Sequence, residues 1–156
     1  MILDMDESLI KEAARNLRIQ TVNLLESRIQ CGELTPINLT NDNSEVKIGR
    51  GLIRFSSFEL EDDQGKAVKA VSFVYQCGLK ISKKTDKLKE DNGLLAIEVS
   101  FSALYLLNEE LSDECLTEFG KHNVPYHVWP YWREYAQSTL MRMGVSPVHI
   151  PFYQVS

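Results

Sequence analysis

The most regular part of the sequence is residues 95–107, which read Leu95-Ala96-Ile97-Glu98-Val99-Ser100-Phe101-Ser102-Ala103-Leu104-Tyr105-Leu106-Leu107. Apolar side chains occupy every odd-numbered position, and Glu98, Ser100 and Ser102 lie between them. This alternation predicts a β-strand with one buried face and one face in water. A strand with one solvated face is typical of an antiparallel sheet.

Three segments upstream of this strand have strand patterns of their own. Residues 18–31 predict a long strand, and its alternating face carries Ile19, Thr21, Asn23, Leu25, Ser27, Ile29 and Cys31. Residues 46–60 predict a second strand, with a bulge at Gly49 and Gly51. One phase of this strand contains Val46, Ile48, Leu52, Phe58 and Leu60. Residues 71–81 alternate as a third strand after a predicted hairpin turn at residues 61–65.

Two polar segments connect these strands. Residues 32–44 contain Pro36 and several Asn and Thr residues, a composition that favours a loop crossing the sheet over a regular element. Leu34, Ile37 and Leu39 give this crossing loop side chains to bury. The lysine-rich residues 80–90 predict an exposed connection before the fourth strand.

Helices are predicted at both ends of the chain. Residues 6–16 combine an acidic start with apolar residues at helical spacing. Ser112 is suited to cap a short helix that ends near Gly120, and residues 120–128 predict a connection. Because proline is tolerated in a first helical turn, the main helix is predicted from Pro130 to Gly144.

Four strands followed by helices predict an α+β fold. We expect a four-stranded antiparallel sheet with a crossing loop, a short N-terminal helix, and a long C-terminal helix packed on the sheet. The expected organisation is a single domain over residues 1–156. Its parts are an N-terminal helix extension (1–17), a sheet (18–107), a helical part (111–144) and a C-terminal segment (145–156).

The composition is that of an ordinary globular domain, with 156 residues, 44% hydrophobic residues and a net charge of -5. The acidic balance argues against nucleic acid as a partner. The longest stretch without a charged residue is 143–156, which Pro147 and Pro151 interrupt, so no membrane insertion is expected. The acidic N-terminus differs from a secretory signal, and three widely spaced cysteines suit reduced thiols. We therefore expect a cytoplasmic protein.

The polar residues form no catalytic or metal-binding motif. The three histidines lack the spacing partners of a zinc site, and residues 49–51 lack the context of a phosphate-binding loop. We therefore expect no metal, no cofactor and no catalytic residue. The alternative interpretation is a small α+β enzyme with an apolar pocket, which would use Glu134 or pair Cys115 with His122 or His127.

Aromatic residues are concentrated around the main helix. The cluster consists of Tyr126, Trp129, Tyr131, Trp132 and Tyr135, and Phe152 and Tyr153 follow near the C-terminus. Such rings bury large areas and keep polar tips. They suit either the packing of a helix on a sheet or an apolar groove. A groove of this kind fits an extended peptide better than one small molecule.

A motif in this region resembles a known family. Residues 129–134 read Trp129-Pro130-Tyr131-Trp132-Arg133-Glu134, and Gly144 and Pro147 follow. They resemble the helix start and the Gly-x-x-Pro exit of the SecB protein-export chaperone family. The order of elements agrees over residues 18–153, with the specific matches between Leu94 and Pro147. The resemblance implies a holdase that binds unfolded polypeptide without ATP, in an apolar groove between sheet and helix.

The resemblance also implies site residues. The expected peptide-binding residues are Trp129 and Tyr131 on the helix, Leu95 and Tyr105 on the fourth strand, and Leu34, Ile37 and Leu39 on the crossing loop. Glu98 matches an acidic position through which family members dock on the export motor SecA, and an ordinary exposed carboxylate explains it equally well. The implied assembly is a homotetramer made of two dimers, with Leu140 or Met143 in the helix contacts.

Two differences from the export chaperones of this family bear on which polypeptide is the client. Export chaperones of this family usually continue into a flexible acidic tail, whereas this sequence ends at Ser156, which puts SecA docking in doubt. The helix at residues 6–16 and the sequence at residues 133–135 are more similar to SecB-like chaperones of toxin–antitoxin systems. The expected clients are therefore preproteins or an antitoxin. A dedicated adaptor that binds one folded partner through the same aromatic surface is the third interpretation.

Overall fold

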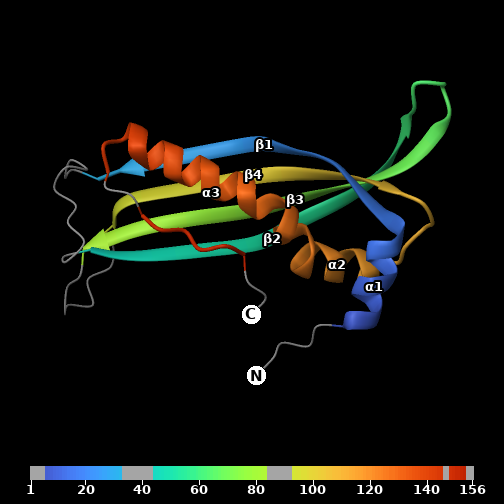
Figure 1. The fold of residues 1–156 in the computed structure, drawn as a ribbon, viewed down its shortest axis with the longest axis horizontal. Coiled ribbons are helices and arrows are strands. Elements are labelled where there is room, and N and C mark those ends of the chain that lie inside the picture. The colour runs from blue at the N-terminus through green and yellow to red at the C-terminus, as the bar shows by residue number, and fades with distance from the viewer. Residues whose placement is uncertain (1–5, 33–43, 84–92, 146–147, 154–156) are drawn as a thin grey trace.

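The structure is a computed structural model that describes residues 6–32, 44–83, 93–145 and 148–153 (Figure 1). Four long strands form one sheet, a short helix precedes it, and two helices follow it. The elements in chain order are α1 (Glu7–Asn16), β1 (Leu17–Cys31), β2 (Ser44–Glu61), β3 (Ala67–Lys83), β4 (Gly93–Leu107), α2 (Asp113–His122) and α3 (Val124–Arg142). The predicted α+β fold is confirmed.

The strands pair antiparallel in the order β1-β4-β3-β2. Consecutive strands β1 and β2 therefore lie at opposite edges of the sheet, and the chain passes from one edge to the other between them. The predicted crossing loop, with Leu34, Ile37 and Leu39, lies outside the described residues. The predicted hairpin turn joins β2 and β3, and Gly65 takes the positive φ of 77° that this turn requires.

β-Bulges change the side-chain phases predicted for the edge strands. In β1, shifts in register next to Gln20 and Leu25 place Val22 and Leu24 on the core side, while Thr21 and Asn23 pair with residues of the other face. The predicted face of Thr21, Asn23 and Leu25 was therefore wrong, because each extra residue in a bulge reverses the alternation.

The bulge in β2 also differs from its prediction. The register shifts between Leu52 and Arg54, whereas Gly49 and Gly51 pair regularly with β3. Phe58 and Leu60 consequently belong to the face opposite Val46 and Ile48, with which they were predicted to share a phase.

One face of the sheet carries the core. α3 packs on β3 and β4 and contacts β1, and α2 contacts β2, so the helices cover the middle of this face (Figure 1). Trp132 of α3 is fully buried there. Phe73, Tyr105 and Phe119 form a cluster of rings, with T-shaped contacts of Tyr105 to both phenylalanines at centroid distances of 5.4 and 5.1 Å. Of the helices that the structure describes, none is long and apolar enough to cross a bilayer.

The main helix begins earlier than predicted. Asn123 alone separates α2 from α3, so the connection predicted at residues 120–128 is largely helical. The proline tolerated in the first turn is Pro125, and Pro130 lies inside the helix. Pro130 has no N–H for the carbonyl of Tyr126, yet the packing of α3 on the sheet keeps the helix continuous.

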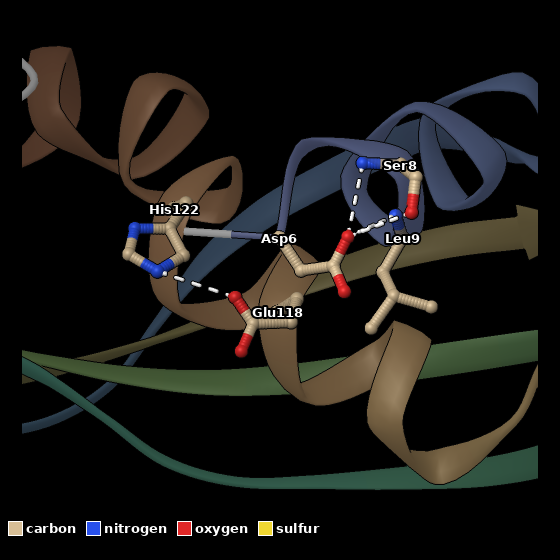
Figure 2. Close-up of polar contacts among 5 residues, drawn as sticks. All are labelled: Asp6, Ser8, Leu9, Glu118 and His122. Carbon is tan, nitrogen blue, oxygen red and sulfur yellow. Dashed lines mark hydrogen bonds and ion pairs between the residues drawn. The ribbon is translucent and has the colours of Figure 1, made fainter. Parts of the chain in front are cut away.

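Helix ends follow local sequence closely. The carboxylate of Asp6 accepts hydrogen bonds from the backbone of Ser8 and Leu9 and caps α1 (Figure 2). The Ser112 hydroxyl caps α2 by accepting from the Cys115 amide at 3.2 Å. Gly144, with φ of 75°, ends α3 as predicted.

Candidate peptide-binding site

Apolar side chains remain exposed along both edges of the helix-covered face. Leu24 and Ile29 of β1 are 51% and 45% exposed, and Val46 and Ile48 of β2 are 39% and 37% exposed. Their cross-strand partners are Phe101, Ile97, Ile81 and Leu79, all of which are buried. The four side chains thus belong to the core face but lie beyond the cover of α3.

On one side of α3, tyrosines meet the edge strand β1. The Tyr135 hydroxyl forms a hydrogen bond with the Ser27 hydroxyl of β1. Tyr131 precedes Tyr135 by one helical turn, so it lies on the same side of α3, and it is 51% exposed. Leu24, Ile29, Tyr131 and Tyr135 are called the β1-side surface below. Ser27 lies between Leu24 and Ile29 on this face, so the surface combines apolar side chains with a central pair of hydroxyl groups.

On the other side of α3, the chain returns as an extended segment. Residues 148–153, called the C-terminal strap below, have no regular secondary structure and run beside α3 toward its N-terminal end (Figure 1). The Arg133 Nε donates to the Ile150 carbonyl at 2.8 Å, and the Trp129 Nε1 donates to the Pro151 carbonyl at 2.7 Å. Side chains of α3 therefore hold the backbone of the strap.

Arg50 of β2 joins the strap to the sheet. Its Nη1 donates to the Tyr75 and Tyr153 hydroxyls at 3.2 and 3.1 Å. The guanidinium lies 4.6 Å from the ring centroid of Tyr153 and 6.0 Å from that of Trp129, which are cation–π distances. Burial raises the pKa of Tyr75, and the neighbouring Arg50 partly offsets this, so the phenol stays protonated at neutral pH.

The predicted site residues of α3 lie on different sides of it. Trp129, only 5% exposed, faces the strap, whereas Tyr131 belongs to the β1-side surface. Two residues correspond to about 200° of helical rotation, so neighbouring odd positions cannot line one side of a helix. Leu95 and Tyr105 are 1% and 0% exposed. They lie in the core, so neither is open to a peptide in this structure.

Tyr105 has a polar partner in this core. Its hydroxyl lies 2.8 Å from the Nδ1 of His127, and the two rings are 5.6 Å apart. Burial raises the pKa of Tyr105 and lowers the pKa of His127. Both groups are therefore neutral at physiological pH, and the hydrogen bond joins two uncharged side chains.

We expect His127 to make the stability of the protein pH-dependent. The unfolded chain takes up a proton near the ordinary pKa of 6.5, while the folded chain resists it. The contribution of His127 is therefore complete above pH 6.5 and is lost as the pH falls through the lower folded pKa. Urea unfolding between about pH 7 and pH 5 should show a smaller loss of stability in His127→Gln than in the parent. His149→Gln, at an exposed position, is the control. If the free energy of unfolding depends on pH equally in the parent and both variants, the prediction is contradicted.

Glu98 lies on the opposite face of the sheet and is exposed. Gly49, Gly51 and Gly78 lack side chains around it and, with Gln76, leave a shallow depression of about 280 Å³. The backbone of the sheet is accessible there. A docking role of Glu98 stays a prediction.

The structure does not bring Cys115 together with a histidine, as one form of the enzyme interpretation requires, and Glu134 is exposed. The Cys115 thiol donates to the Glu12 carboxylate at 3.5 Å, and the carboxylate of Glu118 lies 3.4 Å from His122 (Figure 2). His127 pairs instead with Tyr105. Among the described residues, no group of three or more His, Cys, Asp or Glu side chains is placed to hold a metal ion.

Sequence reasoning missed two arginines of this region. Arg50 interrupts an apolar strand face between Ile48 and Leu52, and a lone charge at such a position indicates a specific partner. Arg133 was noticed only as part of a motif. Its contact with the strap joins residues 17 positions apart, and no local pattern reveals it.

The fold is similar to that of a solved protein, the SecB-like chaperone Rv1957 of Mycobacterium tuberculosis, in complex with a ChAD peptide from the HigA1 antitoxin Rv1956. The likeness has a TM-score of 0.69 at 16% sequence identity, and it covers 97% of this chain and 100% of that chain. No family model matches the sequence, and no curated protein matches it. The SecB-like fold implied by the sequence resemblance is thereby confirmed.

Proposed function

We propose that this chain with a SecB-like fold is an ATP-independent holdase, which binds unfolded or aggregation-prone polypeptide and turns over no substrate. The observation that carries the proposal is the exposed apolar side chains along both edges of the helix-covered face, at Leu24, Ile29, Val46 and Ile48. Large apolar side chains left exposed in pairs on a face that is otherwise packed fit a surface that another polypeptide covers. The structural neighbour, which holds an antitoxin peptide, supports a polypeptide as the ligand.

The energetics suit a holdase. Covering a half-exposed Leu or Ile side chain contributes roughly 1 kcal/mol, so one such contact is weak. A micromolar complex requires roughly 8 kcal/mol, so a client must make many such contacts along its length. Because these contacts require apolar side chains and no specific sequence, many unfolded clients satisfy them.

Client and assembly are part of the proposal. An antitoxin is the favoured client class, given the peptide bound by the structural neighbour, and preproteins with docking of Glu98 on SecA are the second class. The working compartment is the cytoplasm and the working form is a homotetramer. Leu140 is buried within the chain at 1% exposure, so Met143 and the 74% exposed Met141 are the apolar groups of this helix end available to a second copy.

Aggregation of an unfolded model protein, followed by light scattering without ATP, tests the holdase function. We expect near-stoichiometric protein to suppress aggregation and to have a tetrameric mass in solution. Tyr131→Ala should lower client affinity about fivefold or more, because it removes an exposed ring from the β1-side surface. Its unfolding curve should match that of the parent.

Other outcomes identify other functions. Unchanged aggregation by the parent protein would contradict the holdase proposal. Binding of one folded partner alone would favour the adaptor. A substrate-dependent activity abolished by Glu134→Gln would favour the enzyme interpretation.

A further inference from the structure

We propose that the space between α3 and β2 is a binding subsite for an extended client segment, that the C-terminal strap (residues 148–153) occupies it as an internal ligand, and that a client displaces the strap. The proposal rests on the proposed holdase function, and it adds the binding mode and the chemistry of the recognised segment.

The backbone contacts of the strap do not depend on its sequence. Arg133 and Trp129 donate to the carbonyls of consecutive residues, Ile150 and Pro151. The two donors are four positions apart on α3, so they lie on one side of the helix, one turn apart. Every peptide carries such carbonyls, and any extended segment that runs in the same direction can accept the same two hydrogen bonds.

The side-chain contacts define what the subsite accepts. Ile150 is fully buried, whereas Phe152 is 73% exposed and lies with its ring centroid 4.1 Å from the guanidinium of Arg133. Tyr153 contacts the Tyr126 and Trp129 rings at centroid distances of 4.6 and 5.8 Å. The subsite therefore selects an aliphatic residue followed three positions later by an aromatic one.

The strap does not fill its space completely. A cavity of about 380 Å³ lies where the strap begins, lined by Gln137, Met141, Val145, Val148 and His149. This cavity is open to solvent, because Gln137, Met141 and His149 are exposed. The cavity offers room for another apolar side chain of a longer client.

Displacement has a measurable consequence for affinity. A client binds this subsite only in molecules whose strap has left it. The apparent dissociation constant is therefore the intrinsic constant divided by the fraction of molecules with a free subsite. Weakening the strap without altering the subsite should therefore strengthen client binding. Phe152 and Tyr153 belong to the strap, whereas Arg133, Trp129 and Arg50 form the subsite.

Hydrogen–deuterium exchange of the intact protein tests displacement directly. We expect the backbone amides of residues 148–150, 152 and 153 to exchange faster when a reduced, alkylated and permanently unfolded model protein is bound at saturation; Pro151 has no amide hydrogen. Unchanged or slower exchange of these amides in the complex would overturn the proposal and leave the holdase function standing. Failure of the model protein to bind at all would overturn both.

The double variant Phe152→Ala/Tyr153→Ala provides the second measurement. It should bind the same unfolded protein about 3- to 10-fold more tightly than the parent, since the subsite is free more often. Phe58→Ala, which removes a 39% exposed ring from the other face of the sheet, is the matched control and should leave the affinity unchanged. Equal or weaker binding by the double variant would overturn the proposal.

Discussion

Trp132→Ala should lower the free energy of unfolding by about 3–5 kcal/mol, the range for deleting a buried tryptophan from a packed core. Trp132 is fully buried between α3 and the sheet, and its removal leaves a cavity that the rigid strands cannot close. A loss of this size is a large share of the roughly 5–15 kcal/mol of stability of a typical domain. Urea unfolding followed by circular dichroism measures it.

Two variants make this test specific. Glu134→Ala changes an exposed residue of the same helix and should alter stability by less than about 0.5 kcal/mol. Trp132→Phe should cost less than Trp132→Ala, because the buried Nε1 of Trp132 has no hydrogen-bond partner among the described residues. A Trp132→Ala protein as stable as Glu134→Ala would show that α3 is not packed on the sheet in solution.

Leu24→Asp should weaken client binding about 10-fold or more, which corresponds to about 1.4 kcal/mol. The carboxylate would lie on the β1-side surface, where a bound client side chain would have to remove its water. Because Leu24 is 51% exposed in the free protein, folding should be unaffected. Fluorescence anisotropy of a labelled unfolded protein measures the affinity, and the unfolding curve checks the fold.

The matched control is Leu60→Asp. Leu60 is 38% exposed on an edge strand, but it pairs with Val68 on the other face of the sheet. The same introduced charge should leave client affinity within about twofold of the parent, since an exposed substitution away from the site has little effect. If both variants lose client affinity equally, the loss comes from the added negative charge and not from its position. If both keep the affinity of the parent, the β1-side surface is not part of the binding site.

Only part of the candidate site follows from local sequence, and the peptide-binding role of its residues stays a prediction. The aromatic composition of the sequence predicted that the main helix belongs to the site. Trp129 donates a hydrogen bond to the C-terminal strap, and Tyr131 is exposed on the β1-side surface. The sequence did not reveal that they lie on different sides of α3. It also did not reveal Arg50 and Arg133, because their contacts with Tyr153 and Ile150 join residues far apart in the chain.

Local sequence was sufficient for the strands, the caps and the fold class. Alternation in β4, the capping side chains Asp6 and Ser112, and the glycines at 65 and 144 act through neighbouring residues, so their effects can be read without knowing the fold. The phases of β1 and β2 depended on bulges, which form only when a strand pairs with its neighbour. The start of α3 ahead of Pro130 depended on packing that outweighs a missing hydrogen bond. The strap became a candidate ligand only in three dimensions, because side-chain donors on a helix meet a distant backbone only after the chain has folded back on itself.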